Sequence, residues 1–267
     1  MQAIRVENLS KTFRVKRKEK GMRGSVKAIF HPQTEEIRAV NGVSFSVEEG
    51  EMLAFIGPNG AGKSTTIKML TGILYPDGGR VEVLGVDPTK KRRQLAYQIG
   101  TVFGQKEQLW THLTPYDNFR FFGAIYDLTE RETEARIGEL SERFALKEFI
   151  DTPVRNLSLG QRIRCEMAAA LIHKPKVLFL DEPTIGLDPV VKENVRELIR
   201  QMNREEHTTV FLTSHDVGDI EKLCRRIIIV NDGQIVLDDS VEHLKSHYLE
   251  HSLEEIIVEI YKAQEED

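Results

Sequence analysis

The sequence has few cysteines and no large excess of charge of either sign. Its two cysteines, Cys165 and Cys224, lie far apart and do not have the spacing of a metal site. Both stand among apolar residues, so we expect small buried side chains rather than a disulfide, and nothing indicates an oxidising compartment. A net charge of −5 over 267 residues gives no general attraction to nucleic acid or to an anionic membrane, so a nucleic-acid partner is not expected.

Long hydrophobic runs are also missing. No run approaches the roughly 18 to 20 apolar residues that a membrane span needs, and no apolar signal segment follows the first residues. We therefore expect a soluble chain whose role at a membrane, if any, depends on a partner. The 40% of hydrophobic residues is ample for a packed core in one or two domains.

Short apolar strands alternate with helical stretches over most of the chain. Strands are expected at 52–56, 81–84, 99–103, 177–180, 209–213 and 226–230. Helices are expected at 64–74, 161–172, 190–203 and 217–224. A hairpin turn is expected at the Asn-Asp-Gly of residues 231–233. This alternation predicts an α/β domain with a mainly parallel sheet.

Two insertions interrupt this pattern. Residues 3–9 and 43–47 alternate like strands of a β-rich N-terminal layer, and the basic segment between them, about 14–38, is expected to be an exposed insertion. From about 107 to 149 the pattern is helical, which predicts a helical insert. The apolar side chains expected on one face of that insert are Phe119, Phe122, Ile125 and Tyr126.

The tail from Val241 is also expected to be helical and amphipathic. Its apolar stripe comprises Leu253, Ile256, Ile257 and Ile260.

Residues 57–64 read Gly-Pro-Asn-Gly-Ala-Gly-Lys-Ser and fit the phosphate-loop pattern G-x-x-x-x-G-K-[ST] at every position. Glycines allow the backbone N–H groups to turn toward phosphate oxygens, and the following helix directs its N-terminus at the same anion. Lys63 adds a positive charge near the β- and γ-phosphates, Ser64 can bind Mg²⁺, and Thr65 can bond another phosphate oxygen. The loop residues expected to contact ATP are Gly57, Asn59, Gly60, Gly62, Lys63, Ser64 and Thr65.

A pair of acidic residues ends the apolar run Val177–Leu180. Such a run is typical of a strand that is buried on both faces. Asp181 at its end can hold Mg²⁺ directly or through water, and Glu182 can orient and deprotonate a water in line with the γ-phosphate. A solvated strand end is the alternative, but the phosphate loop upstream favours the catalytic interpretation.

With these two motifs, the chain resembles the ATP-binding subunit of an ATP-binding cassette (ABC) transporter over residues 1 to about 240. Six segments appear in the order of that family: 57–65, Gln105 within 102–105, 157–161, 177–183, 186–189 and 213–216. The resemblance implies a P-loop NTPase (RecA-like) core, an N-terminal antiparallel β layer, and an inserted helical subdomain at about 106–172. Residues 241–267 would then be a short helical tail.

The resemblance also implies a head-to-tail pair of cassettes, most simply a homodimer, with two ATP molecules between them. Residues 157–161 read Leu-Ser-Leu-Gly-Gln, and Ser158, Gly160 and Gln161 would contact the ATP bound to the partner's phosphate loop. A hydroxyl and a helix N-terminus at this position suit a γ-phosphate. Asp188 would cross the interface between the two sites.

Further residue roles follow from the same resemblance. His215 would hold the γ-phosphate and sense hydrolysis. Gln105 would contact Mg²⁺ or the attacking water and lead into the helical insert, which docks on transmembrane permease subunits at the cytoplasmic face of the membrane. Phe13 matches the position of the aromatic residue that stacks on adenine, although tyrosine is usual there and a core position for Phe13 is the alternative.

Residues 57–66 and 183–188 are similar to the export-type branch of this family, so export is expected. A DNA-repair or chromosome-organising ATPase is less favoured, because residues 105 and 157 are too close for a long coiled-coil insert and no cysteine pair lies between them. A translation factor would carry two cassettes. A regulatory, non-catalytic module is disfavoured by the presence of both Glu182 and His215.

Overall fold

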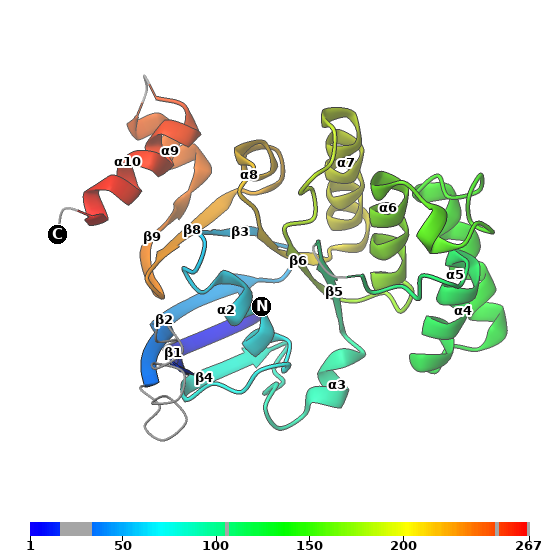
Figure 1. Cartoon of the computed structure of the whole chain (residues 1–267), viewed down its shortest axis with the longest axis horizontal. Helices are drawn as coiled ribbons and strands as arrows, with labels where there is room; N and C mark the ends of the chain where they lie inside the picture. Colours follow the sequence, from blue (N-terminus) through cyan, green and yellow to red (C-terminus); the bar gives the residue numbers. More distant parts are fainter. Residues whose placement is uncertain (17–33, 105–106, 249–250, 266–267) are drawn as a thin grey trace, which may run out of the picture.

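The computed structural model describes residues 1–16, 34–104, 107–248 and 251–265. Within them, a six-stranded sheet has the order β5-β6-β7-β3-β8-β9 (Figure 1). Its strands are β3 (Met52–Ile56), β5 (Ile99–Phe103), β6 (Val177–Asp181), β7 (Thr209–Thr213), β8 (Arg226–Asn231) and β9 (Gln234–Ser240). The first five in that order pair in parallel, and β9 pairs antiparallel with β8. The predicted α/β fold with a mainly parallel sheet is therefore confirmed.

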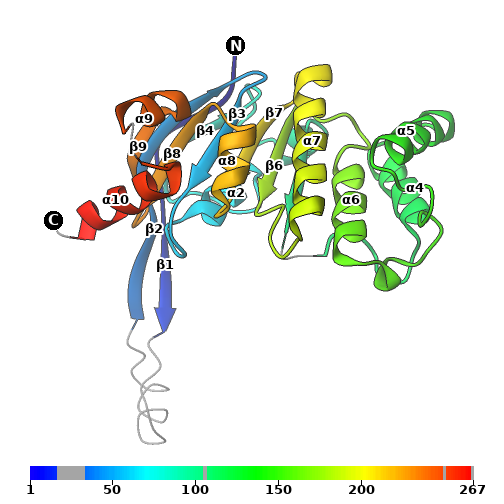
Figure 2. The ribbon, with the colours of Figure 1, turned by 90° about the horizontal axis from the view of Figure 1, so that it is seen from above.

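A smaller antiparallel sheet forms the N-terminal layer, with the order β2-β1-β4. Its strands are β1 (Gln2–Lys16), β2 (Thr34–Glu48) and β4 (Gly78–Val83). At both described ends of the expected basic insertion the backbone is paired strand: Arg14 pairs with Glu36 and Lys16 with Thr34. Figure 2 shows β1 and β2 extending together beyond the rest of the molecule. Residues 17–33, the remainder of that insertion, lie outside the described residues.

Helices cover the sheets and form the predicted helical insert. They are α2 (Lys63–Leu70), α3 (Arg92–Ala96), α4 (Pro115–Ile125), α5 (Glu130–Arg143), α6 (Leu159–Ala170), α7 (Pro189–Glu206), α8 (Val217–Leu223), α9 (Val241–His247) and α10 (Leu253–Glu265), with a 3-10 turn at Val154–Asn156. Helices α4, α5 and α6 gather on one side of the molecule (Figure 1). In the part of the chain that is described, no helix combines the length and apolar character that a membrane crossing requires.

The central strands of the six-stranded sheet are buried on both faces. Along β6, Val177 and Phe179 face the antiparallel layer, whereas Leu178 and Leu180 face the helices on the other side. Phe179 belongs to an aromatic group in which neighbouring ring centroids, such as those of Phe55 and Phe211, lie 5.2 Å apart. Full burial of one such side chain stabilises the fold by about 1.5–3 kcal/mol. This packing fixes the carboxyl end of β6, where the acidic pair stands.

Two expected helix boundaries were wrong for local reasons. Helix α2 ends at Leu70 rather than at residue 74, because Gly72 has a φ of 70° and its N–H bonds to the carbonyl of Met69. Helix α6 begins at Leu159, two residues before the expected start, because Ser158 and Gln161 form a reciprocal capping box. Gly160 therefore lies in the first turn of the helix and not before it.

The apolar face expected for the helical insert is only partly buried. Phe119 is fully buried, but Ile125 is 47% exposed at the end of α4. The expectation for Ile125 was wrong, because α4 ends there. In the tail, by contrast, Leu253, Ile256 and Ile257 are buried as predicted, in the same core cluster as α8.

Candidate active site

The phosphate loop connects β3 to α2 and approaches other backbone segments closely. A Cβ atom on Gly57 would lie 2.3 Å from the carbonyl oxygen of Val230, and one on Gly62 would lie 2.1 Å from that of Ala39. Gly62 also has a φ of 99°, a conformation that L side chains rarely adopt. Glycine is therefore required at both positions for the loop to fold over the end of the sheet.

Lys63 is buried at the start of α2. Its Nζ atom donates hydrogen bonds to the carbonyl oxygens of Gly57 (2.6 Å) and Pro58 (3.1 Å), and lies 3.4 Å from Nε2 of His215. Burial lowers the pKa of Lys63, although Glu182 and Asp181 oppose the shift by favouring the charged form. The lysine is thus held among oxygen atoms at the mouth of the loop.

The two residues of the acidic pair have different hydrogen-bond partners. Asp181 Oδ1 accepts a hydrogen bond from the hydroxyl of Thr213 on β7 (2.6 Å). Glu182 has a φ of 57°, and its backbone N–H bonds to the carbonyl of Thr213 (3.0 Å). This left-handed conformation is unusual for a residue other than glycine, asparagine or aspartate, and such strain is common in active sites.

The side chain of Glu182 meets His215. Its Oε2 atom accepts a hydrogen bond from the backbone N–H of His215 (3.2 Å), and its Oε1 atom lies 3.3 Å from the histidine Nε2. Burial raises the pKa of Glu182, while His215 and Lys63 act to lower it. A carboxylate with a raised pKa is a stronger base, as deprotonation of a water requires.

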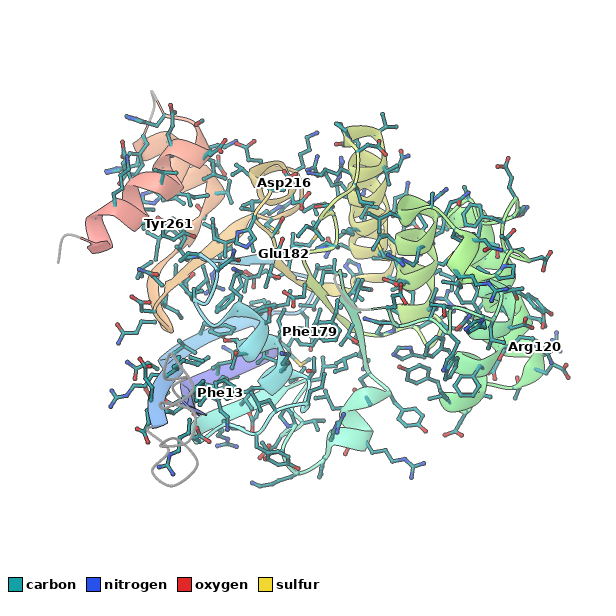
Figure 3. All side chains as sticks on the ribbon, in the orientation of Figure 1. Phe13, Arg120, Phe179, Glu182, Asp216 and Tyr261 are labelled. Atoms are coloured by element: carbon teal, nitrogen blue, oxygen red, sulfur yellow. The ribbon has the colours of Figure 1, made fainter. Side chains whose placement is uncertain are left out.

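Residues 59–65 of the phosphate loop, Asp181, Glu182 and His215 line one pocket of about 510 Å³, whereas Gly57 does not line it. The side chain of Glu182 lies near the centre of the molecule in Figure 3, where the ends of the parallel strands meet. The sequence correctly predicted that the loop, the acidic pair and His215 would come together. Lys68 and Ile185 also line the pocket and were missed. Lys68 could have been found from its spacing, since it stands one helical turn after Ser64.

Oxygen ligands for a magnesium ion are available in this pocket. Ser64 offers a hydroxyl and Asp181 a carboxylate. No cluster of three or more acidic, histidine or cysteine residues suited to a metal was found among the described residues. Two protein oxygens fit Mg²⁺ bound together with a nucleotide, because this ion usually keeps several waters and takes phosphate oxygens as ligands.

Other predicted site residues do not line this pocket. Ser158 caps α6 by accepting a hydrogen bond from the backbone of Gln161 (3.3 Å), and Gly160 packs against Val191 on α7. Asp188 caps α7 by accepting hydrogen bonds from the backbone N–H groups of Val190 and Val191. Ser158 and Asp188 are exposed, and Gly186 in the loop before α7 faces Leu159 in the first turn of α6.

Two further predicted residues lie elsewhere. Phe13 is on β1, 36% exposed, with Lys11 Nζ 5.8 Å from its ring centre. The alternative of Phe13 as a core residue was therefore wrong, and Figure 3 shows its side chain on the antiparallel layer. Gln105 lies outside the described residues.

Comparison with known proteins gives one family. Residues 40–185, more than half of the chain, match the family model described as "ABC transporter". The ABC transporter ATP-binding protein NatA of Bacillus subtilis (strain 168) is 35% identical over 215 residues, which cover 80% of this chain and 87% of NatA. The linearmycin resistance ATP-binding protein LnrL of the same strain is 39% identical over 197 residues, 74% of this chain and 63% of LnrL.

A solved structure shares the fold. It is the dimeric, post-hydrolysis state of the ATP-binding cassette MJ0796 bound to ADP and Pi. The two chains superpose with a TM-score of 0.74 at 26% identity, over 89% of this chain and 98% of that one.

Proposed function

Because the chain belongs to the ABC transporter family and is an ATP-hydrolysing, ATP-binding subunit of that family, we propose that two copies pair head to tail and share two ATP sites. The observation that supports this most directly is the division of the motifs. Lys63, Glu182 and His215 line one pocket, whereas Ser158 and Asp188 lie outside it. The proposed pairing brings Ser158 of each copy to the pocket of the other.

The predicted site residues have proposed roles in phosphoryl transfer to water. Backbone N–H groups of residues 59–62 and the ammonium of Lys63 would hold the β- and γ-phosphates. Ser64 and Asp181, with Gln105, would hold Mg²⁺, which neutralises charge on the phosphates when bound. Asn59 and Thr65 would bond phosphate oxygens beside them.

Glu182 would accept a proton from the attacking water. Its carboxylate is pinned on one side by the backbone of His215, so one oxygen remains for the water. The imidazole of His215 would bond the γ-phosphate and so sense its loss on hydrolysis. Phe13 would stack on adenine, as its exposed ring allows.

The partner's contribution would come from the N-terminus of α6. The Ser158 oxygen accepts a hydrogen bond within the capping box, but its O–H remains free to donate to a phosphate. Gly160 in the first turn keeps the approach to the backbone open, and Gln161 completes the cap. Asp188 would link the two sites across the interface.

We also propose that permease subunits dock on the helical insert at the cytoplasmic face of the membrane, and that the direction of transport is export. Trp110, Leu113, Phe121 and Ile125 are each between 38% and 47% exposed there. The ring centres of Trp110 and Phe121 lie 4.0 Å apart, so they form one apolar surface. Export accords with relatives such as LnrL, which is named for linearmycin resistance.

We infer that residues 1–240 form the cassette, 106–172 its helical subdomain and 241–267 a packed tail.

The purified chain should release phosphate from ATP only with Mg²⁺, and its specific activity should rise with protein concentration as dimers form. Phosphate release and light scattering measured on the same samples test this. Full specific activity in a sample that stays monomeric, or no hydrolysis at any concentration, would contradict the proposal.

A further inference from the structure

A buried carboxylate that no predicted motif includes lies directly behind the catalytic residues. Asp219 on α8 is 0% exposed and accepts three side-chain hydrogen bonds. Its Oδ2 atom accepts from the hydroxyls of Thr184 and Ser214, each at 2.6 Å, and its Oδ1 atom accepts from Nε of Arg196 at 2.7 Å. A group that is both charged and fully buried needs such partners to offset its lost hydration.

The two hydroxyls belong to the two catalytic loops. Thr184 stands two residues after Glu182, and Ser214 immediately precedes His215. These loops follow the neighbouring parallel strands β6 and β7, and they also meet through the contacts of Glu182 with Thr213 and His215. One carboxylate oxygen therefore fastens the segment that carries the base to the segment that carries the histidine.

The third partner connects this carboxylate to α7. Arg196 is 7% exposed and bonds Asp219 through Nε and Asp216 through Nη2 (3.0 Å). Gly218 allows this approach, because a Cβ there would lie 3.0 Å from the same Nη2 atom. Figure 3 places Asp216 on the same side of the molecule as Glu182. Since Asp188 caps the N-terminus of α7, the link connects to the helix that follows the residue proposed to cross the dimer interface.

We propose that Asp219 is a positioning residue for ATP hydrolysis, which holds Glu182 and His215 in register through Thr184 and Ser214. This rests on the proposed function. The carboxylate does not touch ATP; it sets the relative position of two groups that do. Displacement of a catalytic group by about 1 Å can cost about 100-fold in rate, so the effect should appear in kcat.

An amide replaces this carboxylate poorly. An ionised carboxylate only accepts hydrogen bonds and has room for all three donors, whereas asparagine presents one oxygen and an NH₂ group that donates. In Asp219→Asn, the buried guanidinium of Arg196 loses its charged partner, and hydroxyls that face the NH₂ group must accept from it instead of donating. Weaker neutral hydrogen bonds therefore replace the charge-assisted bonds that hold the two loops, with almost no change in volume.

The test compares Thr184→Val and Asp219→Asn with the wild-type full-length chain. Thr184→Val removes one tether and keeps the shape of the side chain. Thr208→Val is the matched control, because Thr208 is 1% exposed and its hydroxyl bonds no other described residue. We expect kcat to fall about tenfold in Thr184→Val and about 100-fold in Asp219→Asn, with the KM for ATP changed less than about threefold. Thr208→Val should keep the wild-type kcat.

Thermal unfolding of each variant separates positioning from loss of fold. Two results would overturn the inference: folded variants with wild-type kcat, or a loss of kcat in Thr184→Val that Thr208→Val shares. If Asp219→Asn does not fold, the kcat of Thr184→Val compared with that of Thr208→Val tests the inference. A wild-type chain without ATPase activity would instead contradict the proposed function, so the two failures can be told apart.

Discussion

Replacement of Glu182 by glutamine is expected to lower kcat for ATP hydrolysis by about 100-fold or more, while ATP still binds. Glutamine keeps the size of the side chain and can accept the hydrogen bond from the backbone of His215, but it cannot take a proton from water. With hydrolysis blocked, the ATP-bound dimer should persist. Phosphate release and the elution volume with ATP on a sizing column measure the two effects.

The pH dependence of the wild-type rate should also identify Glu182 as the base. Burial raises the pKa of Glu182, so the carboxylate takes up a proton at a higher pH than an exposed glutamate does. The rate should therefore fall on acidification in a range above the usual pKa of glutamate.

The control for Glu182→Gln is Glu130→Gln, since the Glu130 side chain is 81% exposed on α5 and its replacement should leave the rate unchanged. A wild-type rate in Glu182→Gln would exclude Glu182 as the base.

Replacement of Lys63 by alanine is expected to weaken ATP binding by about 10- to 100-fold, because a hydrogen bond to a charged group contributes about 1.5–3 kcal/mol. The rate of hydrolysis should fall further, since the lysine would also stabilise the negative charge that develops on the phosphates in the transition state. Fluorescent ATP-analogue titration and phosphate release measure the two quantities.

The control for Lys63→Ala is Lys147→Ala, whose side chain is 69% exposed in the helical insert. That variant should bind ATP as the wild type does. An unchanged dissociation constant for ATP in Lys63→Ala would show that Lys63 does not bind the phosphates.

Patterns that depend on neighbours in the sequence were predictable. The phosphate loop follows from glycine spacing, and β6 from four consecutive apolar residues. The start of α6 lies two residues before the predicted one, and the local signal for it is the capping-box spacing of Ser158 and Gln161. Ile125 was placed on a buried face because periodicity does not show where α4 ends.

Contacts between distant segments could not be predicted in this way. Asp219 fits the pattern of an exposed polar residue near the start of a helix, yet it is fully buried by Thr184, Arg196 and Ser214. Nothing local in the sequence brings those four side chains together; the parallel pairing of β6 with β7 does. The position of Ser158 outside its own subunit's pocket followed from the family resemblance and not from its local pattern.

The shared site is the central claim, and mixing two inactive variants tests it most directly. In Lys63→Ala the phosphate loop is defective, and in Ser158→Arg a bulky cation occupies the cap of α6. A mixed dimer with head-to-tail sites has one site with both defects and one with neither. Ser158→Arg alone should still bind ATP, which shows that it is folded.

The measurement is phosphate release by the two variants, alone and mixed in equal amounts. Random pairing makes half of the dimers mixed, so we predict about a quarter of the wild-type rate if the sites act independently, whereas each variant alone is nearly inactive. A mixture no more active than its components, with mixed dimers demonstrated by differential tags, would contradict the account.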